Sequence, residues 1–261
     1  MIRIRFAPTI CVVAVLSMLV ASPLQGQYDN WSEDQDDNDS DLTAFAVIVG
    51  AIAATTPFWL PIAATHDENS EPGYFAEYPY KHGKSGNMLI GDSLRSDSYN
   101  WAFQAKTAYA ESFGRFRRID AGLQLEGTHR FGIDAEFDYW RESVVSGQRH
   151  SFWTGDANLM FRFAQSEWLQ TRVGLGGNWL EDDANSDYGF NFTYKADLFV
   201  RDPLILSGEL DWGTLGDETL FHPRITLGAQ WHRAELFIGA DYFDIGPTQA
   251  TSMIAGGRFW Y

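Results

Sequence analysis

The feature that most constrains this chain is an alternation of apolar and polar residues that runs from about residue 99 to residue 261. At its start, Trp101 and Phe103 alternate with Asn100 and Gln104. Successive side chains of a β-strand point to opposite faces, so this period of two predicts strands with one apolar and one polar face. Ten such segments follow one another, and each is long enough to cross a bilayer at the tilt of a barrel.

The connections between these segments differ in apparent length. Short connections lie near 128–130, 164–167, 202–203 and 233, and longer polar ones near 112–117, 142–150, 181–187, 213–222 and 244–249. Short turns on one side and long loops on the other are typical of an antiparallel barrel that crosses a membrane. The sequence therefore predicts an all-β fold, a ten-stranded antiparallel transmembrane β-barrel with up-and-down topology over 99–261. Twelve strands remain an alternative if residues 65–98 add a hairpin.

The size of the apolar side chains indicates which face points outward. A soluble barrel around a greasy ligand would turn these side chains inward, but a ten-stranded barrel has no room for so many large rings. We therefore expect the apolar face to contact lipid and the polar face to line the interior. The large outward rings include Trp101, Phe137, Phe161, Trp179, Phe192, Trp212 and Trp231.

The polar face carries charges of both signs, and we expect them to form a charge network inside the barrel. Because acids outnumber bases there, one hypothesis is a passive, cation-preferring pore for small solutes. The favoured hypothesis is a filled interior in which bases neutralise carboxylates, since unpaired buried charge is costly. The predicted network consists of Lys106, Glu126, Asp134, Glu136, Asp138, Arg162, Arg172, Lys195, Asp197, Glu209, Asp211, Arg224 and Arg258.

The N-terminal part resembles a leader followed by a polar spacer. Residues 1–26 combine basic residues, a short apolar run and small residues, which predicts a secretory signal peptide. Residues 27–41 are strongly acidic and predict a disordered linker. The only cysteine, Cys11, lies in the apolar run of the leader, so the exported chain is expected to contain no disulfide.

An apolar block over 42–64 predicts a helix, with Asp41 as its N-cap and Pro57 as its end. Such a helix is shorter than the hydrocarbon core, which a spanning helix must match. We expect it to pack on or inside the barrel, with a membrane anchor as the alternative. Residues 65–98 are expected to form a loop, in which 87–91 are the one candidate strand and Tyr74, Phe75, Tyr78 and Tyr80 pack against a rim.

The sequence contains no convincing catalytic, cofactor-binding or metal-binding motif. His150 and His222, with the acids of the longer connections, are the candidates for a hydrolase at the loop rim. Their spacing matches no metal motif, and acidic loops are ordinary on a wet surface, so we expect no enzyme. The formal net charge of −16 also argues against nucleic acid as a partner.

The last residues complete the sequence argument. Gly256, Phe259 and Tyr261 resemble the C-terminal assembly signal of bacterial outer-membrane β-barrel proteins, with a terminal Tyr in place of the usual Phe. The resemblance implies insertion into the outer membrane by the barrel insertion machinery, with outer-membrane lipid as the partner. It implies no shared activity. The expected function is a structural or surface role without an assigned reaction.

Overall fold

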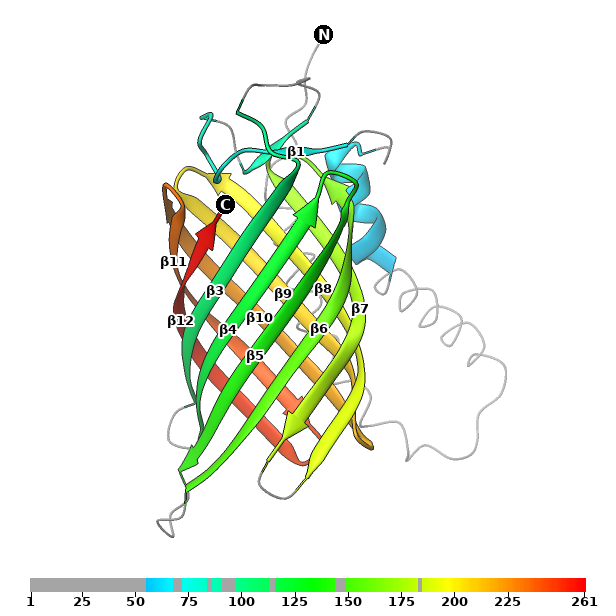
Figure 1. Cartoon of the computed structure of the whole chain (residues 1–261), viewed down its shortest axis with the longest axis vertical. Coiled ribbons are helices and arrows are strands. Elements are labelled where there is room, and N and C mark those ends of the chain that lie inside the picture. Colours follow the sequence, from blue (N-terminus) through cyan, green and yellow to red (C-terminus); the bar gives the residue numbers. More distant parts are fainter. Residues whose placement is uncertain are drawn as a thin grey trace, which may run out of the picture. The chain divides into compact units, whose positions relative to one another are not determined.

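A computed structural model of the chain describes residues 55–67, 72–83, 86–90, 97–112, 116–143, 149–182 and 185–261. The chain divides into two compact units, Met1–His66 and Asp67–Tyr261. All the strands that the structure describes lie in the second unit (Figure 1).

Ten strands of the second unit close into one antiparallel barrel (Figure 1). Each strand pairs with its neighbours in the sequence, and β12 pairs with β3 to close the sheet. The prediction of a ten-stranded meander is therefore confirmed, and the twelve-stranded alternative is wrong. The strands are β3 (Trp101–Ser112), β4 (Phe116–Gly127), β5 (Phe131–Ser143), β6 (Arg149–Gln165), β7 (Leu169–Glu181), β8 (Ser186–Arg201), β9 (Leu204–Leu215), β10 (Glu218–Trp231), β11 (Ala234–Ile245) and β12 (Thr248–Trp260).

The apolar face of the barrel points outward, as the alternation predicts. Along β4, exposed Ile119, Leu123 and Leu125 alternate with buried Asp120 and Gln124. Large apolar side chains would not stay exposed in water over so much of the barrel, so this exterior is suited to lipid. Other exposed members of this surface are Phe131, Ile133, Phe137, Leu159, Leu175, Trp212, Leu236, Ile238 and Met253.

The prediction of long loops at one end of the barrel is wrong in two places. Residues 216–217 and 246–247 are two-residue turns, because the flanking strands continue their hydrogen-bonded pairing almost to the tip. Gly216 and Gly246 have φ values of 60° and 52°, which two-residue hairpins require. The polar residues near these turns belong to strands that extend beyond the apolar band, and polarity alone suggested a loop.

A second, two-stranded sheet pairs β1 (Tyr74–Phe75) with β2 (Met88–Leu89). It lies at the end of the barrel where the short turns and Tyr261 are found (Figure 1). The candidate strand within 87–91 is therefore present, and its partner β1 lies in the segment that was expected to be loop throughout. Phe75 and Met88 are each 1% exposed, so this sheet is well packed.

In the first unit, residues 55 to 65 are helical. The prediction that Pro57 ends this helix is wrong. The fixed φ of proline suits a helix, and its steric cost falls on the preceding turn, so residues after Pro57 can remain helical. No helix among the described residues is both long and apolar enough to cross a membrane. The predicted leader, the acidic linker and residues 42–54 lie outside the described residues, and packing of the helix on the barrel stays a prediction.

Candidate functional site

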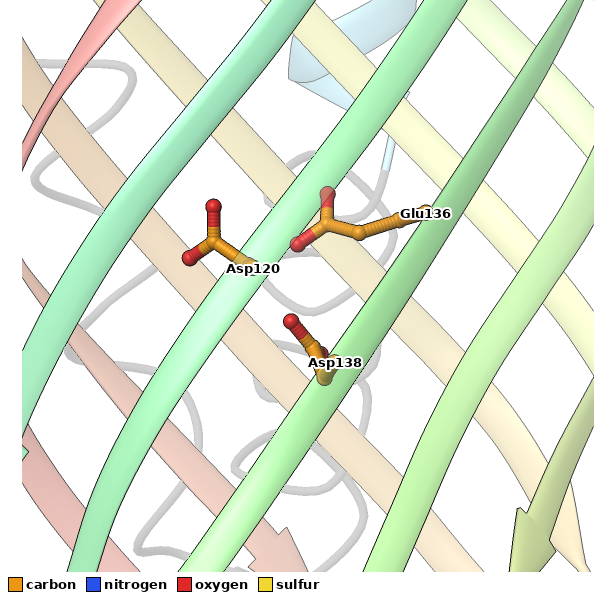
Figure 2. Close-up of side chains that lie close together, drawn as sticks. All are labelled: Asp120, Glu136 and Asp138. Carbon is orange, nitrogen blue, oxygen red and sulfur yellow. The ribbon is translucent and has the colours of Figure 1, made fainter.

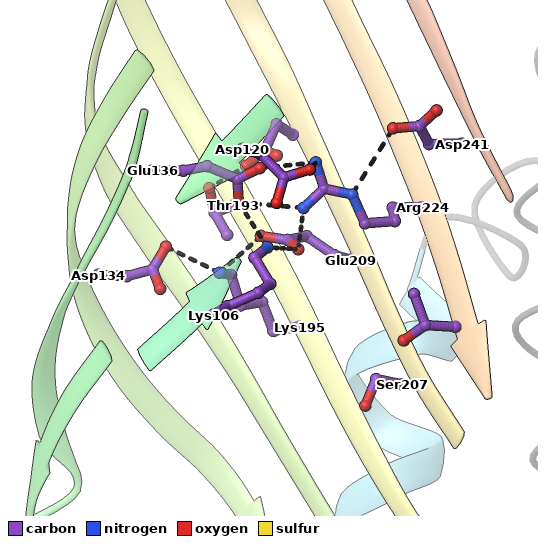
Figure 3. Close-up of polar contacts among 12 residues, drawn as sticks. Lys106, Asp120, Asp134, Glu136, Thr193, Lys195, Ser207, Glu209, Arg224 and Asp241 are labelled. Carbon is purple, nitrogen blue, oxygen red and sulfur yellow. Dashed lines mark hydrogen bonds and ion pairs between the residues drawn. The ribbon is translucent and has the colours of Figure 1, made fainter. Parts of the chain in front are cut away.

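The centre of the barrel is occupied by an ion network that joins opposite walls. Arg224 on β10 donates to Glu136 on β5 at 2.6 Å, and these strands are five positions apart in the ring of ten. Lys106 on β3 contacts Glu136 at 2.6 Å and Glu209 on β9 at 3.3 Å. Arg224 also reaches Glu209 at 3.2 Å. Figure 3 shows these side chains converging from several strands into the interior.

Lys195 on β8 extends this network toward another part of the wall. Its ammonium group lies 2.5 Å from Glu209 and 2.8 Å from Asp134 on β5 (Figure 3). Both contacts are largely shielded from solvent, with side-chain exposures of 12% or less. The base therefore connects β5, β8 and β9, and the pairing neutralises carboxylates that would be costly to bury alone.

A second cluster of charged side chains lies nearer the end of the barrel that carries Tyr261. Glu126 on β4 accepts ion pairs from Arg162 on β6 and Arg172 on β7. Arg172 also donates to Asp197 on β8 at 2.6 Å. Two carboxylates and two guanidinium groups thus link β4, β6, β7 and β8. Bidentate guanidinium groups suit such shared contacts because they present several donors in a fixed plane.

Arg258 on β12 links this strand to β11 and β9 through side-chain contacts in the interior. It donates to Glu235 on β11 at 2.9 Å and to Ser207 on β9 at 2.9 Å. Trp260 also donates its indole N–H to Glu235, at 2.9 Å. At Gly228 an added Cβ would collide with the Glu235 carboxylate, so glycine allows this group to lie close to the wall.

A third cluster lies toward the opposite end of the barrel. Arg118 on β4 pairs with Asp241 on β11 and lies 3.6 Å from both Asp120 and Asp138. His222 on β10 lies 3.3 Å from both the Arg118 guanidinium and the Asp241 carboxylate. Arg118 was absent from the predicted network because residues 112–117, directly before it, were assigned to a loop. Continued alternation back to Phe116 would have revealed it.

An apolar cluster lies inside the barrel next to Arg118. The Arg118 guanidinium stacks 4.8 Å from the centre of the Trp140 ring. Trp140 is 1% exposed and packs against the rings of Phe116 and Phe243. The pattern of polar residues inside and apolar residues outside is therefore broken at this end. Leu220 and Ala250 complete the cluster.

The opposite mouth is covered by the described residues of 67–90, which we call the mouth segment. Asp67 receives two hydrogen bonds of 2.7 Å from Arg130 in the turn after β4. The Phe75 ring lies under Arg162, 5.0 Å away, and Asn87 accepts a hydrogen bond of 2.7 Å from Gln170 on β7. The expected packing of the aromatic residues of this segment against the rim is thus observed for Phe75.

Tyr78 and Tyr80 of the mouth segment also contact the rim. The Tyr80 hydroxyl donates to the carbonyl of Leu204 at 2.5 Å, and its ring packs edge-on against Phe199. Burial raises the pKa of Tyr80 above its ordinary value, since the charged form would lose its hydration. The Tyr78 ring lies 5.8 Å from His232 in the turn after β10.

Three carboxylates, Asp120, Glu136 and Asp138, lie close enough to one another to share a cation (Figure 2). Each offers an oxygen within 4.8 Å of the others. However, Glu136 already binds Arg224, and the Arg118 guanidinium lies 3.6 Å from both aspartates. Arginine thus supplies the positive charge at this place, and a metal ion would have to compete with it.

One interior cavity lies among these charged side chains. Its volume is about 30 Å³, enough for one or two water molecules. Lys106, Glu136, Lys195, Glu209 and Arg224 are among its lining residues. A second cavity of about 10 Å³ lies beside Phe75 of the mouth segment. These volumes fit isolated water molecules between ion pairs.

Some interior carboxyl groups accept hydrogen bonds from neutral side chains and form no ion pair with a base among the described residues. Asp156 accepts a hydrogen bond of 2.6 Å from Asn158, and Asp211 accepts one from Thr193. Asn191 lies 3.3 Å from Asp211 as well. The interior acids therefore outnumber the interior bases, as the sequence indicates.

The structure places all thirteen residues of the predicted charge network in the interior and brings most of them into direct ion pairs. The two candidate catalytic histidines behave differently. His150 is exposed on β6, whereas His222 is 7% exposed inside the barrel. His222 and Asp241 form a histidine–carboxylate pair, and the Arg118 guanidinium contacts both residues. The pair lies in the interior of the barrel and not at a rim that is open to substrate.

The three residues of the suggested assembly signal all lie at the closing seam. Phe259 is exposed on the outer face, and Tyr261 stacks 5.1 Å from Trp101 on β3. Gly256 allows close approach to β3, because a Cβ there would collide with the Thr107 carbonyl. Recognition of these residues by insertion machinery stays a prediction.

Comparison with solved structures finds outer-membrane barrels. The outer membrane protein Ail of Yersinia pestis in a phospholipid bilayer nanodisc shares 13% identity, with a TM-score of 0.34 over 61% of this chain and 99% of Ail. Neisserial surface protein A shares 10% identity, with a TM-score of 0.33 over 61% of this chain and 94% of its own. The KdgM porin shares 11% identity, with a TM-score of 0.28 over 60% and 98% of the two chains. No protein-family model and no curated protein matches the sequence.

Proposed function

We propose that this chain, an outer-membrane β-barrel by its closed ten-stranded fold and its apolar exterior, has a structural or surface role and does not conduct solutes. The observation that carries the proposal is the contact of Arg224 with Glu136, which joins two strands on opposite sides of the barrel at 2.6 Å. Together with the contacts of Lys106 and Lys195 with Glu209, this ion pair places charged side chains across the middle of the barrel. The function then resides on the outer surface and the rims.

Two further layers support a closed interior. The mouth segment covers the end of the barrel that carries Tyr261, and the Trp140 cluster fills the other end. Each layer contains buried apolar side chains, which a water-filled channel would expose. The proposed closed interior thus has three successive levels, and the mouth segment and the Trp140 cluster are independent of the central ion pairs.

The test is conductance of the purified protein in a planar lipid bilayer. We expect no discrete steps from the wild-type barrel, with heat-modifiable migration on a gel as proof that the inserted protein is folded. An established general porin in the same bilayer serves as the positive control. Reproducible single-channel steps from folded wild-type protein would contradict a closed interior.

A cation-preferring pore is the second candidate, and the excess of interior acids favours it. Asp156 and Asp211 accept hydrogen bonds from Asn158 and Thr193, which are neutral groups and not bases. If steps are seen, the pore hypothesis requires a reversal potential that favours cations in a salt gradient. Substitution of Asp156 and Asp211 by asparagine should then reduce that preference.

A further inference from the structure

The outer face of β3–β6 carries an aromatic row near the end of the barrel that lies opposite Tyr261. Strand register aligns Tyr109, Ile119, Tyr139 and Trp153 side by side on this face. Tyr109, Ile119 and Trp153 are exposed. Tyrosine and tryptophan with an apolar body and a polar tip mark the level at which hydrocarbon meets the headgroups.

Two arginines form the next row of the same face, two residues farther from the middle of the barrel. Register places Arg117 on β4 directly opposite Arg141 on β5, and both are exposed. The side chains of directly paired residues in an antiparallel sheet lie close together, and like charges in such a pair repel. Both arginines therefore present positive charge at one point, at the level just beyond the aromatic row.

The protein itself neutralises this pair incompletely. Arg117 has one partner, Glu111 on β3, at 3.3 Å, and the Arg117 side chain remains 58% exposed. Arg141 lies 5.7 Å from the centre of the Tyr139 ring, and within the described part of the chain no carboxylate lies within 4.0 Å of its guanidinium. The pair is also unusual for this chain, whose formal net charge is −16. The net charge of the protein repels anionic lipid, so any attraction of anionic lipid to this arginine pair would be local.

We propose that Arg117 and Arg141 bind a phosphate-bearing lipid headgroup at this rim. A phosphate placed between two guanidinium groups relieves their repulsion and accepts charge-assisted hydrogen bonds from both. The aromatic row places the arginines at the depth where phosphates of the adjoining leaflet lie. The inference depends on the lipid-facing exterior alone, so an open or a closed interior leaves it unchanged.

The test compares lipid affinity of the wild type with that of R117Q/R141Q, at matched protein folding. The probe is phosphatidic acid in vesicles or nanodiscs of phosphatidylcholine, with retained lipid counted by native mass spectrometry. Each arginine near a charged surface contributes about fivefold in affinity, so the double variant should bind about thirtyfold more weakly. R117K/R141K keeps the charge without the planar fork and should fall between the two.

The matched control is R201Q, because Arg201 is an exposed arginine at the other end of the barrel. This control should retain phosphatidic acid as the wild type does, and heat-modifiable migration should show that every variant is folded. Excess inorganic phosphate distinguishes a headgroup site from a free anion site, since a membrane-level site should keep its lipid. Equal retention by R117Q/R141Q and wild type, an equal loss in R201Q, or displacement by inorganic phosphate would each overturn the proposal.

Discussion

Arg224 extends from β10 across the interior of the barrel and contacts Glu136 on β5 and Glu209 on β9. Its replacement by glutamine would leave the two carboxylates with less positive charge while they remain buried. Removal of one partner from a buried ion pair commonly costs about 3–5 kcal/mol, and we expect a loss of that order in the free energy of unfolding. Urea titration in detergent micelles, followed by the gel shift of the folded barrel, measures it.

Arg201→Gln is the matched control for this prediction, since Arg201 is exposed. A surface substitution of this kind should change stability by no more than about 0.5 kcal/mol. If Arg224→Gln and Arg201→Gln unfold at the same urea concentration, the central contacts contribute nothing to stability. The ion network would then be an arrangement of charges without a structural role.

At the scale of the elements, the two-residue turns after β9 and β11 depend on glycine. Gly216 and Gly246 have positive φ values, which a β-branched residue adopts only at a cost of roughly 1–2 kcal/mol. We expect Gly216→Val and Gly246→Val each to destabilise the barrel by about that amount, whereas asparagine, which tolerates this conformation, should cost less. Urea unfolding of the four variants compares them, and equal stability would indicate flexible loops in place of tight turns.

The strands and their faces were predictable from the sequence because lipid imposes the alternation on every crossing. The ends of the elements were not. Polar residues beyond the apolar band fit a loop and an extended strand equally well, and this ambiguity concealed Arg118 on β4 and moved His222 to a rim. The helix across Pro57 was missed because proline restricts the turn before it more than the residues after it.

The partners within the charge network were the other part that sequence could not supply. Alternation indicates that Lys106, Glu136 and Arg224 all face inward, but the closure of the sheet decides which of them meet across it. The burial of the mouth segment was even harder to predict from the sequence, because its strands β1 and β2 have only two residues each and show no alternation. Contacts between distant segments of the chain are set by tertiary packing and have no local pattern.

At the scale of the whole molecule, the proposed closed interior has three layers, and we expect that removing any single layer leaves the barrel non-conducting. One variant replaces Trp140 and Phe243 with alanine, a second lacks residues 72–90, and a third has serine at the five central ionic positions. Only the combination of all three should give conductance steps in a planar bilayer. The five positions are Lys106, Glu136, Lys195, Glu209 and Arg224.

Each of these variants is first checked for heat-modifiable migration, so that a silent record from unfolded protein is not counted. Steps from the variant without residues 72–90 alone would mean that the mouth segment is the main barrier and that the ions leave a path. Steps from the five-serine variant alone would show that neither end is sealed. Either result would contradict the three-layer description.

The hydrogen-bonded ladder between β3 and β12 differs from the other nine ladders of the barrel in the sequence separation of its strands. Its partners, such as Gln104 and Trp260, are far apart in the sequence, whereas every other ladder joins strands that follow one another. This ladder has eight paired positions, while the one between β11 and β12 has twelve. Before β12 reaches β3, the growing sheet has two bare edges that are open to pairing with other chains. The interval between export of the first strand and arrival of the last is therefore the time during which this protein is most exposed to aggregation.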